Sequence, residues 1–344
     1  MSAAMRRLVI TRHGGPEVLQ VQEAAEPVPG PGEIRIRVRA AGLNFADVLA
    51  RIGLYPDAPP PPVTVGYEVA GVVDAVGPGA RGFREGDRVV ALTRFGGQAE
   101  AVAVPVEQAI HLPGGKDFVE GAALPVNYLT AFLMLERLAT IRPGDRVLIH
   151  GAGGGVGLAA LQIARALGAE TFGTASPSKH ARLRELGLDH PIDYRNRDFE
   201  AEVRRITGGR GVDVILDPIS GAATRKNYRL LAPMGRLFLF GVSSYNRGTR
   251  KRSLVDTLRA LLQTPIFHPI ALMNANKGVI GVNLGRLWGE KERLRAMFEE
   301  LCARWVEGRI RPVIDTTYPL ERAAAAHERI QERQNFGKVV LTID

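Results

Sequence analysis

Residues 146–169 read RVLIHGAGGGVGLAALQIARALGA, and this stretch decides the fold class. Residues 146–150 predict a strand, and residues 156–167 predict a helix soon after it. The turn between them has glycine at positions 151, 153, 154, 155 and 157. Glycine lets a backbone turn tightly and approach a pyrophosphate, and a helix N-terminus offers unpaired N–H groups to an anion. The stretch therefore predicts a strand–turn–helix unit that binds a dinucleotide.

The glycine turn departs from the usual dinucleotide pattern at one position. In G-x-G-x-x-G counted from Gly151, Val156 holds the last glycine position, and Gly157 closes the turn one residue later. No G-K-[ST] follows, which excludes the phosphate loop of nucleotide triphosphatases. Because the turn joins a strand directly to a helix, a dinucleotide site is favoured over a turn with a structural role only.

The segments after this turn alternate between strand and helix. Predicted strands lie at 170–174, 191–194, 212–216 and 236–240, and predicted helices at 178–186, 199–207 and 222–231. Apolar strands without alternating polar residues are typical of a parallel sheet that helices cover on both faces. We therefore predict a doubly wound α/β domain over residues 126–274.

Both ends of the chain have a different pattern. Residues 6–11 and 33–39 alternate apolar with charged side chains, as half-buried strands do. Further predicted strands lie at 69–76, 87–92, 278–282 and 338–343, and helices at 291–308 and 320–334. The tail leaves the alternating rhythm of strand and helix. We therefore expect residues 1–125 and 275–344 to form one β-rich domain, into which the α/β domain is inserted.

Composition narrows the function classes. Of 344 residues, 45% are hydrophobic and 24% charged, as is usual for a globular protein of about two domains. The net charge of +9 is scattered apart from RGTRKR at 247–252, and without a binding motif we predict no nucleic-acid partner. The single cysteine, Cys302, excludes an internal disulfide and a cysteine-based zinc site. No signal peptide or membrane-spanning stretch is predicted, so we expect a cytoplasmic protein.

The end of the second strand of the α/β domain indicates which dinucleotide binds. An enzyme that uses NAD usually has an acidic residue there, which binds the ribose 2′-hydroxyl. This chain has GTASPSK at 173–179, so no carboxylate repels a 2′-phosphate, and Ser176, Ser178 and Lys179 can bind one. We therefore predict NADPH as the cofactor. Lys179 as a solvated helix residue remains the alternative interpretation.

Several segments resemble one known family. They are AAGLNFAD at 40–47, GYEVAGVVDAVG at 66–77, EGDRVV at 85–90, the glycine turn, and NFGKVVL at 335–341. With them the chain resembles, over essentially its whole length, the zinc-free quinone oxidoreductases of the medium-chain dehydrogenase/reductase superfamily. Within that branch, residues 173–194 and NYLTA at 127–131 are most similar to the synaptic vesicle amine transport membrane protein group.

The resemblance implies a GroES-like fold for the β-rich domain, a Rossmann fold for the α/β domain, and a homodimer. It also implies the loss of zinc. Zinc-dependent relatives have a cysteine where this chain has Asn44, and a histidine where it has Tyr67, beside Glu68. None of the seven histidines has a paired metal-ligand spacing, so we predict no metal.

The family pattern also implies roles for single residues. Asn44 and Asp47 would lie near the nicotinamide ribose and the substrate, and Tyr55 would line the substrate pocket. Cofactor contacts are implied for Asn44, Thr130, Gly154, Gly155, Val156, Ser176, Lys179, Tyr194, Phe240, Gly241, Val242, Asn335 and Lys338. Four alternatives stay open, namely Asn44 and Asp47 as helix caps, Tyr55 packed on the proline run 59–62, Tyr194 as a core residue, and the Phe240 side chain as core.

With NADPH and no metal, the implied reaction is direct hydride transfer to an electron-poor acceptor, a quinone or an α,β-unsaturated carbonyl compound. Tyr55 or solvent would supply the proton, since no other general acid stands out. A second interpretation is an NADPH-binding protein that associates with membranes or lipids and has little turnover. For that, residues 247–273, basic and then apolar, would contact an anionic membrane surface. A lid or a dimer contact is the alternative role for the same segment.

Overall fold

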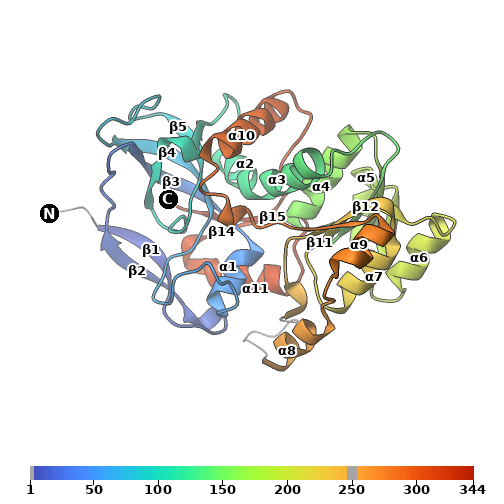
Figure 1. Ribbon diagram of the computed structural model, residues 1–344. Helices are drawn as coiled ribbons and strands as arrows, with labels where there is room; N and C mark the ends of the chain where they lie inside the picture. Colours follow the sequence, from blue (N-terminus) through green and yellow to red (C-terminus); the bar gives the residue numbers. More distant parts are fainter. Residues whose placement is uncertain (1–3, 246–253) are drawn as a thin grey trace. The chain divides into compact units, whose positions relative to one another are not determined.

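The computed structural model describes residues 4–245 and 254–344. Figure 1 shows its helices and strands and labels many of them. The chain divides into two compact units. One holds residues 4–129 and 284–344, and the other holds residues 130–245 and 254–283. Each unit has a sheet and an apolar core of its own, so the second unit interrupts the first along the chain.

The interrupting unit is built on six parallel strands in the order β10-β9-β8-β11-β12-β13. Their bounds are β8 (Arg146–His150), β9 (Glu170–Ala175), β10 (His190–Asp193), β11 (Val212–Asp217), β12 (Leu231–Leu239) and β13 (Gly278–Gly281). The helices that alternate with them are α4 (Gly155–Ala166), α5 (His180–Glu185), α6 (Phe199–Ile206) and α7 (Ala222–Leu230). Strand side chains such as Leu148, Phe172 and Ile215 are fully buried, as expected for a sheet covered on both faces. This confirms the predicted Rossmann fold.

The sixth strand of this sheet lies beyond the limit that the sequence suggests. Arg236 in β12 pairs with Gly278 in β13, and both strands run in parallel. The connection between them carries two helices, α8 (Leu254–Gln263) and α9 (Pro269–Ala275). A domain limit at residue 274 therefore omits a strand. The sequence predicts a strand at 278–282 but not its place in this sheet, because the connection that precedes it is longer than the earlier ones and breaks the alternation of strand and helix.

The other unit carries the β-rich, GroES-like fold. One sheet has the strand order β14-β15-β3-β4-β5-β7, with β6 also paired to β3, and a second sheet pairs β1 with β2. The bounds are β1 (Ala4–Ile10), β2 (Leu19–Ala25), β3 (Glu33–Leu43), β4 (Glu68–Val76), β5 (Arg88–Leu92), β6 (Ala101–Pro105), β7 (Ala109–His111), β14 (Ile314–Pro319) and β15 (Lys338–Thr342). The tail of the chain returns to the main sheet, because β15 pairs antiparallel with β3.

The alternation in β3 shows how sequence sets the two faces of this sheet. Ile34, Ile36 and Val38 are buried, whereas Arg35 and Arg37 point away and form ion pairs with Asp74. The period of two therefore sorts apolar side chains into the core and charged ones onto the other face. Four strands of this unit were not predicted, namely β2, β6, β7 and β14.

Helices of the GroES-like unit are short or lie in the tail. They are α1 (Phe45–Arg51), α2 (Phe118–Ala123), α10 (Lys291–Val306) and α11 (Ala323–Gln331). Helix α3 (Pro125–Phe132) crosses the limit between the units and continues as a π-helix over Leu133–Leu138. Short 3-10 helices lie at Pro16–Val18, Val106–Gln108, Pro177–Lys179, Ser243–Tyr245, Leu284–Arg286 and Leu320–Arg322.

Candidate functional site

The glycine turn forms an anion cradle at the carboxyl end of β8. Gly151 has a φ of +63°, a left-handed conformation that suits glycine, and its carbonyl accepts a 2.8 Å hydrogen bond from the Gly154 N–H. Gly154 is the N-cap of α4 and has no side chain to cap the first turn. The first amides of a twelve-residue helix are thus left for a ligand.

Gly157 allows the helix to begin so close to the turn. A Cβ atom at this position would lie 2.4 Å from the Gly151 carbonyl oxygen and 2.8 Å from the backbone of Ala152. Backbone atoms cannot move aside as a flexible side chain can. The glycine one residue past the usual pattern therefore takes the role of close helix–strand packing, and Val156 sits in the first turn, half-buried.

The carboxyl ends of β9 and β10 bring together two of the residues predicted for the adenosine end. Asp193 is paired with Ala175, so Tyr194 and Ser176 follow their strands at the same level. Ser176 is largely buried, and its hydroxyl lies 3.3 Å from that of Ser178. The Lys179 N–H donates to the Ser176 carbonyl. Tyr194 is 37% exposed, so its interpretation as a core residue is wrong.

The residues after β12 have part of their backbone already engaged. The Phe240 N–H donates to the Asp217 carbonyl at 3.1 Å, and the Gly241 carbonyl accepts from the Ser220 hydroxyl at 2.7 Å. The Phe240 side chain is half-buried, not a core residue. Thr130 lies buried in α3, within the same unit. A predicted contact of the Phe240 N–H with a carboxamide would therefore require its hydrogen bond to Asp217 to break.

A buried ionic network occupies the GroES-like unit. Glu68, at the start of β4, is fully buried and accepts a 2.9 Å hydrogen bond from Asn44 Nδ2 and a 2.7 Å bond from the Val126 N–H. Lys338 Nζ is also buried, donates to Asn44 Oδ1 at 2.7 Å, and forms a short ion pair with Glu68. Each buried polar group of this network thus has a hydrogen-bond or ion-pair partner within it, as buried charges require.

This network engages residues for which a role in ligand binding is expected. Lys338 was predicted to approach a phosphate, but its ammonium is bonded to Glu68 and Asn44 inside its own unit. Sequence reasoning did not predict that Glu68 joins Asn44 and Lys338 in a buried network. The available signal was an ionisable residue at the head of the otherwise apolar strand EVAGVV. Asn335 lies nearby in sequence, and its side-chain amide donates to the Gly337 carbonyl at 2.8 Å.

Asp47 is a capping residue and is inaccessible to a substrate. Its Oδ2 accepts a 2.7 Å hydrogen bond from the Asn44 N–H at the start of α1, and its side chain is 0% exposed. Burial raises the pKa of Asp47 to about 7, against the lowering effect of the Asn44 N–H and of Lys338. Asp47 is therefore a positioning residue. Asn44 is more than a cap, because its side chain links Glu68 to Lys338.

Tyr55 lines a small aromatic pocket in the GroES-like unit. The pocket has a volume of about 50 Å³, and its walls are Tyr55, Asp57, Tyr67, Arg94, Phe95, Gly285, Arg286 and Trp288. Tyr55 and Phe95 each meet Tyr67 edge to face, with ring centroids 5.8 and 5.6 Å away. Burial, followed by the negative charge of Asp57, raises the pKa of Tyr55 to about 12, so its hydroxyl stays protonated at neutral pH.

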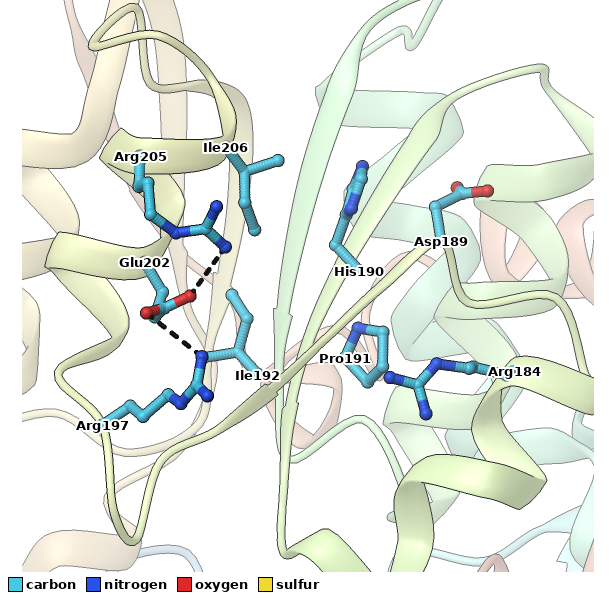
Figure 2. Close-up of a pocket in the computed structure, with 9 residues that line it drawn as sticks. All are labelled: Arg184, Asp189, His190, Pro191, Ile192, Arg197, Glu202, Arg205 and Ile206. Carbon is cyan, nitrogen blue, oxygen red and sulfur yellow. Dashed lines mark hydrogen bonds and ion pairs between the residues drawn. The ribbon is translucent and has the colours of Figure 1, made fainter.

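A larger hollow of about 570 Å³ lies along the edge strand β10 of the Rossmann unit (Figure 2). Glu202 holds Arg197 at 3.4 Å and Arg205 at 3.0 Å on one side, and Arg184 lines the other. Because α5 and α6 run back along the sheet, their last residues lie toward the amino ends of the strands. The glycine turn lies at the carboxyl ends, where ligands of such sheets bind. This hollow is therefore not the dinucleotide site.

The donor groups of the GroES-like unit do not fit a zinc ion. In the described part of the chain, no three His, Cys, Asp or Glu side chains gather as a metal site would require. The positions of the two expected ligands hold Asn44 and Tyr67, and Glu68 is already neutralised by Lys338. Across the described residues, no helix combines the length and the apolar character needed to cross a membrane.

Two family descriptions match the chain. "Alcohol dehydrogenase GroES-like domain" matches residues 30–114, and "Zinc-binding dehydrogenase" matches residues 186–341. Among curated proteins, the synaptic vesicle membrane protein VAT-1 homolog of Mus musculus is 44% identical over 340 residues. That alignment covers 98% of this chain and 83% of the mouse protein.

Solved structures agree along the whole chain. The Escherichia coli quinone oxidoreductase complexed with NADPH has a TM-score of 0.86 and 31% identity, and the match covers 99% of this chain and 100% of that one. The CurK enoyl reductase has a TM-score of 0.85 and 31% identity, with 99% of each chain covered.

Proposed function

The chain belongs to the medium-chain dehydrogenase/reductase superfamily, an oxidoreductase family that includes the quinone oxidoreductases, and from this premise we propose that it reduces a quinone or an α,β-unsaturated carbonyl compound with NADPH. The observation that carries the proposal is the carboxyl edge of the Rossmann sheet. There an uncapped helix N-terminus lies at the same edge as the end of β9, which continues into Ser176 and Ser178 and carries no carboxylate.

The residues of this edge fit a phosphorylated dinucleotide. Gly154, Gly155 and Val156 would hold the pyrophosphate through backbone amides of α4. Ser176, Lys179 and Tyr194 would hold the 2′-phosphoadenosine end, where an acidic residue would repel it. When bound, the nicotinamide supplies the hydride. The predicted contacts of Thr130, Phe240, Gly241, Val242, Asn335 and Lys338 stay predictions.

The chemistry we propose needs no metal. The reaction adds a hydride and one proton to the acceptor, which is reduced by two electrons. A quinone or a conjugated carbonyl accepts hydride without a Lewis acid because its π system takes up the charge. The Tyr55 hydroxyl, protonated at neutral pH, or solvent would donate the proton. Asn44 would orient groups near the nicotinamide from its fixed place between Glu68 and Lys338.

The first experiment is to follow oxidation of NADPH and of NADH by their ultraviolet absorbance, with an ortho-quinone and a 2-alkenal as acceptors. We expect turnover with at least one acceptor and a clear preference for NADPH. Absence of turnover with both acceptors, despite NADPH binding, would refute the reductase function. Equal kcat/KM for NADPH and NADH would refute the cofactor assignment alone.

A second candidate function is attachment to a membrane with little turnover, and one observation favours it. Helices α8 and α9 and the link between them expose apolar side chains, among them Leu262 at 76%, Ile266 at 98% and Met273 at 72%. Such a patch marks an interaction site. Part of the segment proposed for this contact, residues 247–253, lies outside the described residues, including the cluster RGTRKR at 247–252.

Co-sedimentation with anionic vesicles tests this second function. We expect Leu262→Ser/Ile266→Ser to reduce vesicle binding, whereas Met234→Ser, at another exposed apolar residue, should leave it unchanged. Binding that persists in the double variant would refute a membrane role for α8 and α9. The same surface would also serve a homodimer, the assembly that we propose. Light scattering would then report a monomer for the double variant and a dimer for the unchanged chain.

A further inference from the structure

We propose that the aromatic pocket is the acceptor subsite and that Arg94 makes it select planar conjugated acceptors that carry a negative charge. This inference rests on the proposed reduction of an acceptor and adds the class of acceptor to it. It concerns residues of the GroES-like unit only.

The walls of the pocket suit a flat, conjugated molecule. Tyr55, Phe95 and Trp288 line it, and Tyr67 meets two of them edge to face. Aromatic pairs prefer offset or edge-to-face contacts, so a planar ring can add to this set without disturbing it. The Tyr67 hydroxyl is buried and has no hydrogen-bond partner among the described residues. An acceptor oxygen would supply the partner that this hydroxyl lacks.

The size of the pocket limits which part of an acceptor it holds. The pocket measures about 50 Å³, and one water occupies roughly 10–15 Å³ of such a cavity. The pocket thus has room for about three to five waters, comparable with one small ring. It is well below the several hundred Å³ of pockets that enclose a large ligand. We therefore expect one ring to enter, with its substituents toward the rim.

The charges at the rim favour an anionic substituent. Arg286 forms a short ion pair with Asp57, so these two charges offset each other. Arg94 is exposed and has no hydrogen-bond or ion-pair partner in the described residues. The charged side chains that line the pocket therefore sum to one positive charge, and Arg94 carries it. A guanidinium without a partner binds carboxylate, sulfonate or phosphate groups through two parallel N–H donors.

A matched pair of acceptors tests this selection. We would measure kcat/KM for 1,2-naphthoquinone and for 1,2-naphthoquinone-4-sulfonate, which share a ring system and differ by one negative charge. In Arg94→Gln, kcat/KM should fall roughly fivefold for the sulfonate, in the range of an exposed ion pair. It should change less than about twofold for the neutral quinone. Arg94→Lys should restore part of the loss, because it keeps the charge.

Arg81→Gln is the matched control. Arg81 is an exposed arginine of the same unit, outside the pocket, so this variant loses the same charge. A general loss of electrostatic attraction would affect both variants equally, whereas a contact in the pocket would affect only the Arg94 variant. Equal losses for the two acceptors, or equal losses in the two variants, would overturn the proposal.

A binding measurement separates this proposal from the proposed function. Calorimetric titration with 2-naphthalenesulfonate, which is not reduced, needs no turnover. We expect it to bind the unchanged chain several times more tightly than Arg94→Gln. If neither quinone is reduced but this difference appears, the reductase function fails, and with it the acceptor role of the pocket, whereas the selection of anionic aromatic ligands by Arg94 stands. If the quinones are reduced but the two proteins bind the sulfonate equally, the subsite is wrong and the reductase function stands.

Discussion

The carboxyl edge of the Rossmann sheet and the ionic network of the GroES-like unit treat polar groups in opposite ways. At the sheet edge, the first amides of α4 and the Ser176 hydroxyl are placed where a ligand can form hydrogen bonds with them. In the network, the polar groups of Glu68, Lys338 and Asn44 form hydrogen bonds and an ion pair with one another inside the unit. The polar groups of the first region are therefore available to bind a ligand. Those of the second region stabilise the fold of their own unit.

The difference predicts that substitutions in the two regions will alter different measurements. Changes in the network should lower the stability of the GroES-like unit, and changes at the sheet edge should weaken cofactor binding. The chain offers a direct probe, because both of its tryptophans, Trp288 and Trp305, lie in the GroES-like unit. Tryptophan fluorescence therefore follows unfolding of that unit alone.

The largest effect is expected for Lys338→Met. This change removes the cation that neutralises buried Glu68, and breaking a buried pair in this way costs about 3–5 kcal/mol. Urea unfolding followed by tryptophan fluorescence measures it. Lys291→Met, at an exposed lysine of the same unit, is the control. Adding Glu68→Gln to the Lys338 variant should recover at least half of the loss, because no unpaired charge then remains buried. An unaltered midpoint would show that the network contributes nothing.

The next effect is expected for Lys179→Ala, at the sheet edge. Loss of a charged hydrogen bond should weaken NADPH binding by roughly 1.5–3 kcal/mol. NADH lacks the 2′-phosphate, so its affinity in the same variant is the internal control. Calorimetric titration with both nucleotides gives the two values, and the urea midpoint should not change. If NADPH affinity were unaffected, Lys179 would be a solvated helix residue, as the alternative interpretation has it.

The two regions also differ in how far sequence could predict them. The glycine turn and the end of β9 are each a single short stretch of sequence. Their residue pattern alone therefore predicted the strand, the turn, the helix and the cofactor. The network joins residues 24 and 294 positions apart, and no local pattern reports such a contact. The resemblance to a family pointed to Asn44 and Lys338 but assigned Lys338 to a ligand.

Local pattern also explains the errors in the fold. β3 was predicted because its period of two is unbroken, whereas β7 has three residues and β14 contains polar residues throughout most of its length. β13 has four residues, two of them glycine, and follows two helices, so its place in the Rossmann sheet was not visible. The aromatic pocket was missed apart from Tyr55, because its walls come from four separate segments.

Gly157→Ala tests whether the glycine turn of the Rossmann unit holds the pyrophosphate. The added Cβ would push against the Gly151 carbonyl and displace the first turn of α4, at a cost of about 1–3 kcal/mol in packing. We expect weaker binding of NADPH and of NADH alike, since both share the pyrophosphate. Gly281→Ala, where a Cβ meets nothing within 4 Å, is the control. Unchanged binding of both nucleotides would show that the turn does not hold the pyrophosphate.

The smallest expected effect is a dependence of stability on pH, caused by Asp47 beside the network. The pKa of Asp47 is raised from 3.8 to about 7 in the folded chain, so the folded state holds this proton more tightly than the unfolded state. Its contribution to stability is present below pH 3.8 and is lost as the pH rises toward 7. Asp47→Asn keeps an oxygen acceptor for the Asn44 N–H but cannot ionise. The variant should therefore gain stability relative to the unchanged chain on going from pH 5 to pH 8.

We expect this relative gain to be about 1 kcal/mol, less than the full pKa shift implies, because buried sites relax and admit water. Buried His327 acts in the opposite direction. Its pKa lies well below 6.5, so the unfolded chain gains a proton that the folded chain does not, and stability falls as the pH drops below 6.5. Both proteins contain His327, so its effect cancels in the difference between them. A difference that stays constant between pH 5 and pH 8 would mean that Asp47 keeps its charge. The single positive charge of Lys338 would then stabilise the negative charges of both Glu68 and Asp47.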